Sequence, residues 1–219
     1  MPTLILEHGP HGGAGVVGRA LHANGLRTHT ICLSDQDALP ADLDDVDGVA
    51  VCGGQWSACN TSLAWLDSTR AFVKTVHEAG KPILGLGSGG HVVAQAIGGR
   101  VGARDGGARA GLATVRLTPT GRDDPLFRGL PWYGTWPVWG GECVTDLPEG
   151  ATVLASSDGV NEAWVSGVWT YGVEFEAQWN VNTLMQFCDD VSLLPRGGSS
   201  SSAKIAALFA LPAHPQQAL

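Results

Sequence analysis

The sequence has little positive charge and few cysteines. Lysine and arginine together number 13 among 219 residues, against 21 aspartates and glutamates, so the formal net charge is −8. Because no cluster of Lys or Arg occurs, a nucleic acid or an anionic membrane is not expected as a partner. The five cysteines are an odd number without CxxC pairs, which indicates neither a disulfide framework nor a zinc finger. A reduced, cytoplasmic setting is therefore expected.

Long hydrophobic runs are also absent. The opening segment MPTLILEHGP lacks a basic stretch, and its apolar run is too short for a signal peptide or a membrane span. No motif calls for a cofactor, and none is expected. A length of 219 residues with 44% hydrophobic residues instead fits a soluble globular protein with a substantial core.

The first half of the chain alternates apolar strands with amphipathic helices. Strands are expected at residues 3–8, 28–33, 47–53 and 82–87, and helices at 14–24 and at about 63–78. This βαβα rhythm predicts an α/β fold with a doubly wound, mostly parallel sheet and helices on both faces. In such a sheet the ligand site lies beyond the carboxyl ends of the strands.

The pattern changes after Val101. Short β-prone stretches between Gly, Asp and Pro turns predict a small antiparallel appendage or an extension of the sheet. A further helix is expected at NVNTLMQFCDDV. We predict one domain over residues 1–195, a Gly/Ser linker over 196–202, and a short C-terminal helix and tail over 203–219.

One stretch has the shape of a nucleophile elbow. In PILGLGSGGHVVAQAIGGRV an apolar strand is followed by a cluster of glycines and then by a helix of small residues. Such a sharp turn presents a catalytic side chain to solvent. The residue at the tip of this turn is Gly87, which has no side chain to present.

The order of motifs resembles that of the class I glutamine amidotransferases, especially the stand-alone GMP-synthase-type glutaminases. VDGVAVCGGQWS is similar to the family segment DGLVVLGGPMS, and KPILGLGSGGHVVAQAIGGRV is similar to KPVLGICLGHQLLAEALGGKV. DDPLFRGLP, WGGE, LASSDGVNEAW and YGVEFEAQW follow in the family's usual sequence. The resemblance covers nearly the whole chain and implies a flavodoxin-like sheet.

The resemblance also implies that the catalytic triad has been replaced. Members of the family use the Cys of G-x-C-x-G together with the His and the Glu of QFHPE. The matching positions here are Gly87, Glu176 and Gln178. Since glycine cannot carry an acyl group and the base is missing as well, ordinary glutaminase chemistry is not expected.

Three side chains are candidates for other chemistry. Ser88 follows the elbow position, and the resemblance implies that its backbone N–H belongs to an oxyanion hole. Its hydroxyl is either a nucleophile or, as the simpler interpretation, a small side chain that fits a tight turn. Glu176 would share a strand face with Glu174, and it is either a pocket base or fixed anion, or a solvated strand end. His91, on the first turn of a helix, is either a neutral pocket imidazole or a structural histidine.

A ligand pocket is expected around these positions. Tryptophan is frequent in the same region, which suits a flat, apolar or cationic ligand, although at least half of these rings could simply cover the appendage. Cys59 could approach the pocket, but no ligand spacing predicts a metal ion. The predicted pocket residues are Gly54, Gln55, Trp56, Gly87, Ser88, His91, Trp139, Glu142, Glu176 and Gln178.

Two functions remain open. The first is a catalytically silent amidotransferase-like protein that binds a small ligand, such as an amino-acid-like molecule, or docks on a synthetase-type partner or a second copy of itself. The second is a new hydrolase, lyase or cyclase of a specialised pathway that uses Glu176 or His91 beside the oxyanion loop, which the resemblance places at Gly54 and the Ser88 N–H. Because fold alone does not fix function, the two are separated by the geometry of the pocket.

Overall fold

The computed structural model describes residues 1–9, 12–35 and 37–193, with the side chains of 188–193 left aside. A single large sheet organises them. Its strands and those of a small second sheet are β1 Thr3–Glu7, β2 Thr28–Cys32, β3 Gly48–Cys52, β4 Ile83–Leu86, β5 Arg100–Ala103, β6 Arg109–Leu117, β7 Tyr133–Gly140, β8 Glu142–Asp146, β9 Thr152–Ser157, β10 Val160–Ser166 and β11 Thr170–Val173. The helices are α1 Gly15–Ala23, the 3-10 turn η1 Leu33–Asp35, α2 Ala64–Glu78, α3 Ser88–Ala96, α4 Pro119–Asp123 and α5 Val181–Leu193.

The large sheet is parallel in one half and antiparallel in the other. Its order is β2-β1-β3-β4-β11-β10-β9-β6-β7, and the five strands from β2 to β11 run parallel. β3 and β11 are buried at every position, because helices cover both faces of this half. The strands from β10 to β7 continue the same sheet with antiparallel pairing. The remaining two strands, β5 and β8, form a separate antiparallel pair.

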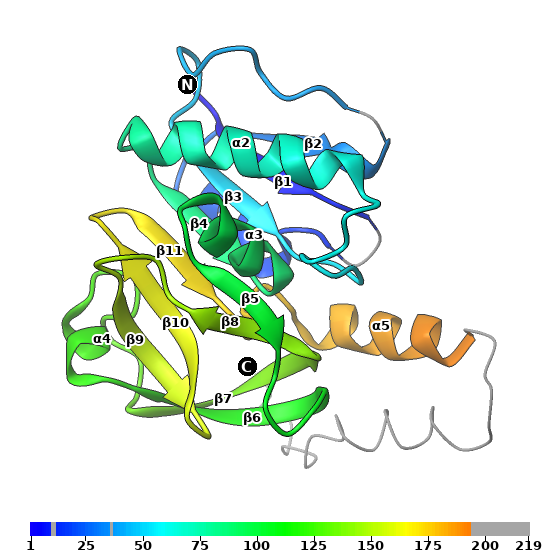
Figure 1. Ribbon diagram of the computed structural model, residues 1–219, viewed down its shortest axis with the longest axis vertical. Coiled ribbons are helices and arrows are strands. Elements are labelled where there is room, and N and C mark those ends of the chain that lie inside the picture. Colours follow the sequence, from blue (N-terminus) through cyan, green and yellow to red (C-terminus); the bar gives the residue numbers. More distant parts are fainter. Residues whose placement is uncertain (10–11, 36, 194–219) are drawn as a thin grey trace.

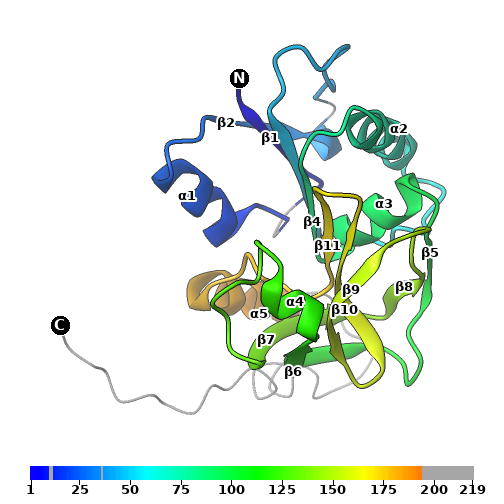
Figure 2. The same ribbon diagram turned by 90° about the vertical axis from the view of Figure 1, so that its left-hand side faces the viewer.

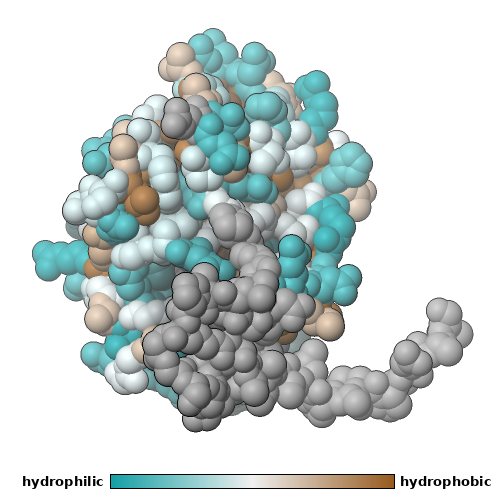
Figure 3. Space-filling model, turned by 90° about the vertical axis from the view of Figure 1, so that its right-hand side faces the viewer, coloured by the Kyte–Doolittle hydropathy of each residue, from teal (hydrophilic) through white to brown (hydrophobic). Residues whose placement is uncertain are grey.

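The layers are plain in the ribbon views. Helices α2 and α3 lie against one face of the parallel half, whereas α1 and α5 lie on the opposite side (Figures 1 and 2). Apolar side chains of α2 and α3 share one core with the strands they cover. On the face shown in Figure 3, hydrophobic residues form small, separated patches among hydrophilic ones.

The expected α/β class is confirmed, and the antiparallel segment proves to extend the main sheet. One expectation was wrong: the last strand, β11, ends at Val173, so Glu174 and Glu176 follow the strand instead of lying on it. The predicted linker over 196–202 and the terminal helix over 203–219 lie outside the described residues. Within the described part of the chain, no helix is long and apolar enough to cross a membrane.

Candidate functional site

The elbow forms where the sequence predicts it. β4 ends at Leu86 and α3 begins at Ser88, so Gly87 alone makes the turn, with φ +55° and ψ −129°. The glycines around it are required by close packing. A Cβ on Gly89 would overlap the Val51 carbonyl oxygen of the neighbouring strand. The tight turn therefore depends on small residues at several positions.

Gly87 and Glu176 fit one another. A Cβ built on Gly87 would lie 2.8 Å from Glu176 Oε1 and 3.0 Å from Oε2. The Glu176 carboxylate thus occupies the space into which a side chain at the elbow would point. A side chain at position 87 would therefore have to displace the Glu176 carboxylate.

Glu176 is buried and weakly paired. It is 8% exposed, and its Oε2 accepts a hydrogen bond of 2.6 Å from Gln178 Nε2. Burial raises the pKa of Glu176 to about 7, although the Gln178 hydrogen bond and nearby His91 favour the ionised form. The carboxyl therefore gains or loses a proton near neutral pH, which is the behaviour of a tuned acid or base. Gln178 itself is 1% exposed and lies behind Glu176 instead of lining the main cavity.

The Ser88 hydroxyl holds the loop that follows β3. Its Oγ accepts a hydrogen bond of 2.9 Å from the Gly54 N–H and donates one of 3.2 Å to the Gly54 carbonyl. The hydroxyl is therefore engaged on both sides and is not positioned as a free nucleophile. The Gly54 N–H, which the resemblance assigns to an oxyanion loop, likewise has its hydrogen-bond acceptor within the protein, the Ser88 hydroxyl.

His91 pairs with a carboxylate. Its Nε2 lies 3.1 Å from Glu174 Oε2, and the ring is 7% exposed. Burial opposes the positive charge, yet the Glu174 carboxylate outweighs it and raises the pKa of His91. The ion pair favours the protonated ring despite the helix N-terminus, which argues against the neutral imidazole, one of the two alternatives considered from the sequence.

Two arginines that the sequence did not single out complete a charged network. Arg109 donates to both carboxylate oxygens of Glu162, at 2.6 and 2.7 Å. Arg104 lies 3.8 Å from Glu162 and 3.5 Å from Glu174. The guanidinium groups are therefore neutralised by carboxylates of β10 and of the segment after β11. Only the strand pairing brings these residues together, so no local sequence signal could have identified them.

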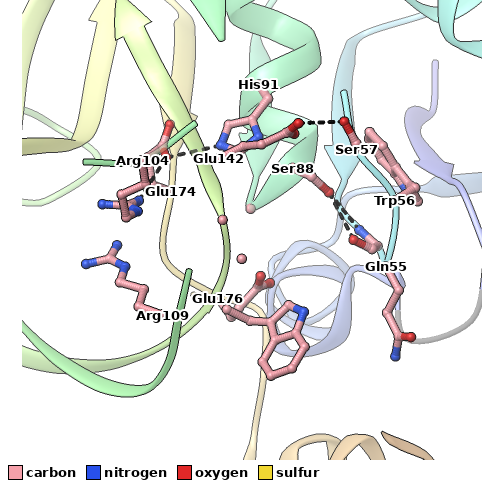
Figure 4. A pocket seen from close by; sticks show the side chains of 15 residues that line it. Gln55, Trp56, Ser57, Ser88, His91, Arg104, Arg109, Glu142, Glu174 and Glu176 are labelled. Carbon is pink, nitrogen blue, oxygen red and sulfur yellow. Dashed lines mark hydrogen bonds and ion pairs between the residues drawn. The ribbon is translucent and has the colours of Figure 1, made fainter. Parts of the chain in front are cut away.

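Glu142 lies on the opposite side of the site from Glu176 (Figure 4). Its Oε1 accepts a hydrogen bond of 2.5 Å from the Ser57 hydroxyl, and its Oε2 accepts one of 3.2 Å from the Ala58 N–H. These bonds join the start of β8 to the loop after β3. No cationic side chain of the described residues forms an ion pair with Glu142.

All these groups surround one open cavity of about 440 Å³ beyond the carboxyl ends of β3, β4 and β11. Figure 4 shows Gln55, Trp56 and Ser57 on one side and the two arginines on the other. Nine of the ten predicted pocket residues line it, all except Gln178, together with Ser57, Arg104, Arg109, Gly140, Gly141 and Glu174. Their functional roles stay predictions.

The aromatic residues divide between the cavity and the rest of the molecule. Trp56 and Trp139 line the cavity. Trp179 lies behind it, with its ring 4.7 Å from that of Phe187. Three other aromatic residues lie away from the cavity. Trp136 stacks on Phe175, and Trp132 and Tyr133 are exposed beside arginines.

Cysteine and metal chemistry find no support in the described residues. Cys59 is exposed, donates its thiol to the Val101 carbonyl and does not line the cavity. Burial and the Glu142 carboxylate raise the pKa of this thiol, which makes it a poorer nucleophile. Within the described residues, no three His, Cys, Asp or Glu side chains are grouped to hold a metal ion. The four cysteines described at the side-chain level are free.

Several known proteins are similar to this chain in sequence. The chain is 32% identical over 152 residues to a subunit of GMP synthase (glutamine-hydrolyzing) from Halobacterium salinarum, covering 68% of this chain and 75% of that protein. It is 33% identical over 145 residues to the same subunit from Natronomonas pharaonis, covering 65% and 68%. A likeness to gamma-glutamyl peptidase 3 of Arabidopsis thaliana reaches 26% identity over 159 residues, covering 68% and 61%.

Solved structures agree on the fold. A glutamine amidotransferase from Methylobacillus flagellatus superposes with a TM-score of 0.82 at 21% identity, covering 95% of this chain and 82% of that one. One from Thermotoga maritima gives 0.79 at 20% identity, covering 88% and 82%. No protein-family model matches the chain. On the identity and coverage of its relatives, the chain belongs to the glutamine amidotransferase-like family that includes these subunits of glutamine-hydrolysing GMP synthase.

Proposed function

We propose that this chain is a glutamine amidotransferase-like protein without glutaminase activity, which acts as a binding or regulatory protein through its remodelled, tryptophan-containing cavity. The observation that carries the proposal is the pairing of Gly87 with Glu176. The elbow has no side chain to form an acyl intermediate, and a carboxylate fills the space beside it. Glu176 and Gln178 stand where the resemblance places the base and its orienting carboxylate.

The engaged oxyanion loop supports the same proposal. Stabilising an oxyanion requires N–H groups that point at the substrate oxygen. The Gly54 N–H instead donates to Ser88 Oγ at 2.9 Å. At the same time the cavity is open and of a size that suits a small ligand, so the site is remodelled instead of collapsed.

A partner protein is part of the proposal. The two archaeal relatives are named as subunits of GMP synthase, so by that name they act within a larger enzyme. We propose that this chain docks on a synthetase-type protein or on a second copy of itself in the cytoplasm. Size-exclusion chromatography with light scattering on the purified chain distinguishes the two. A dimer supports docking on a second copy, and a monomer supports docking on a different protein.

An alternative function rests on one specific observation. A buried carboxyl group with a pKa of about 7 is suited to general acid–base catalysis near neutral pH. Glu176 could then serve a hydrolase, lyase or cyclase reaction in the same cavity, with His91 kept in place by Glu174.

The test is a ligand screen by native mass spectrometry on the protein from its own host, followed by Glu176→Gln and His91→Ala. A binding protein retains its ligand unchanged and loses affinity in one or both variants. An enzyme converts the captured compound, and Glu176→Gln abolishes that conversion. If both substitutions leave affinity and turnover unchanged, the cavity is not the functional site and the proposal fails.

A further inference from the structure

The cavity carries more negative than positive charge. Four carboxylates belong to it or to its ion pairs: Glu142, Glu162, Glu174 and Glu176. Facing them are the two arginines of the network and His91. Even with the imidazole protonated, the three positive groups pair with Glu162 and Glu174, and among the described residues Glu142 and Glu176 have no ion pair. Such a carboxylate is costly to bury in its ionised form, so a bound cation would stabilise it.

Hydrogen bonding distinguishes the two carboxylates that lack an ion pair. Glu174 accepts from His91, from Arg104 and from the Val144 N–H. Glu142 accepts two hydrogen bonds through its two oxygens. Glu176 accepts one, through Oε2 from Gln178, and within the described residues its Oε1 receives none. A carboxylate oxygen of a buried residue thus lines the cavity without a hydrogen-bond donor.

Two tryptophans line the cavity that Glu176 borders. Its own N–H donates to the Pro137 carbonyl of β7 at 2.9 Å, and the same strand carries Trp139, which lines the cavity. Trp56 forms part of the wall on the loop after β3. Indole rings attract cations through their faces and bury aliphatic stems through their area.

We propose that the cavity binds a small organic cation that carries a primary ammonium group on an aliphatic stem. The ammonium group contacts the Glu176 carboxylate, and the stem packs against Trp56 and Trp139. The inference rests on the proposed binding function and assigns its ligand class. An ammonium ion supplies three donors, enough for the free Glu176 oxygen and for neighbouring acceptors. The arginines do not favour an anion instead, because Glu162 and Glu174 already neutralise them.

The test uses three probes of equal length, n-butylammonium, 1-butanol and butyrate, titrated into the full chain at pH 8. The readout is the indole N–H signals of Trp56 and Trp139 in NMR spectra, assigned by single Trp→Phe variants. We expect n-butylammonium to shift these signals with millimolar affinity, and the other two probes to leave them in place at the same concentrations. Equal shifts by butyrate or butanol, or no shift by any probe, would overturn the assignment.

Matched variants test whether the Glu176 carboxylate is the group that binds the cation. Glu176→Gln keeps the shape of the side chain but removes its charge, so the affinity for n-butylammonium should fall at least tenfold. Glu176→Asp retains a charge and should bind more tightly than Glu176→Gln, which separates loss of charge from loss of folding. Glu149→Gln removes an exposed carboxylate outside the cavity and should bind as the natural protein does. A loss shared by Glu149→Gln would indicate general electrostatic attraction and contradict a defined site.

A parallel glutamine assay keeps the two proposals distinct. If the probes fail while no glutamate is formed, the ligand class is wrong and the silent-protein proposal stands. If glutamate is formed, the proposed function fails whatever the probes do.

Discussion

Gly87 and Glu176 form a matched pair at the scale of single residues. Gly87 has a φ of +55°, a conformation that L side chains adopt at a cost of about 1–3 kcal/mol. A nucleophile there would also meet the Glu176 carboxylate at 2.8 Å. A Gly87→Cys substitution alone therefore provides neither space for the thiol nor a histidine base.

The pair predicts a coupled response to substitution. Gly87→Cys should lower the free energy of unfolding by about 2–4 kcal/mol, from backbone strain and from displacement of Glu176. In Gly87→Cys with Glu176→Ala, that loss should be smaller than the sum of the two single losses by at least about 0.5 kcal/mol. Urea denaturation of the four proteins measures this coupling. Additive effects would show that the two side chains do not compete for space.

The ionisation of Glu176 predicts a pH dependence. Because the folded state raises its pKa from 4.5 to about 7, the folded protein holds more protons than the unfolded chain between these pH values. The contribution of Glu176 to stability therefore falls as pH rises through this window. Glu176→Gln should thus be more stable, relative to the natural protein, at pH 8 than at pH 5. Because His91 interacts electrostatically with Glu176, the same comparison in a His91→Ala background isolates Glu176; an equal difference at both pH values contradicts the assignment.

At the scale of elements, the site depends on how β4, α3 and the loop after β3 are joined. Ser88, the first residue of α3, makes two hydrogen bonds to Gly54 across 34 positions of sequence. This contact fixes the loop that carries Gln55, Trp56 and Ser57 at the mouth of the cavity. The hydroxyl therefore has a structural role.

Removal of that hydroxyl tests the role. Ser88→Ala should lower the free energy of unfolding by about 1–2 kcal/mol, since it leaves the Gly54 N–H and carbonyl without this partner. Hydrolysis of p-nitrophenyl acetate should be unchanged, because the Ser88 hydroxyl is engaged by the Gly54 N–H and carbonyl. Ser62→Ala, at an exposed loop position, is the control and should change neither quantity. Loss of esterase activity confined to Ser88→Ala would instead identify a serine nucleophile.

Local sequence patterns predicted these elements well. The strand–glycine–helix pattern located the elbow at Gly87, since its geometry depends on adjacent residues. The end of β11 was missed, because the alternation in YGVEFE continues past Val173 although ladder pairing stops there. Arg104 and Arg109 were missed for a topological reason: they reach the cavity only through the pairing of β5 with β8 and of β6 with β7 and β9.

At the scale of the whole molecule, a buried ionic network connects the antiparallel half of the sheet to the cavity. Glu162 on β10 binds Arg109 on β6, and Arg104 links Glu162 to Glu174 after β11. Glu162 is fully buried, so its charge is compensated only by these partners and by hydrogen bonds such as that from Ser157.

Breaking this network should be costly. Glu162→Gln removes the carboxylate partner of Arg109 and one of the two carboxylate partners of Arg104, and it should lower the free energy of unfolding by about 3–5 kcal/mol. Thermal and urea unfolding measure the loss, and Glu149→Gln at the surface should change stability by less than about 0.5 kcal/mol. A Glu162→Gln protein as stable as the natural one would show that the ionic network does not stabilise the fold.

The central claim is that this amidotransferase-like molecule does not hydrolyse glutamine. Its most direct test is the release of glutamate from glutamine by the purified full chain at pH 8, followed by a coupled dehydrogenase reaction. The account predicts no glutamate above a blank without protein. Glutamate release that grows in proportion to the amount of this chain, and that a Glu176→Gln preparation purified in the same way does not show, would contradict it.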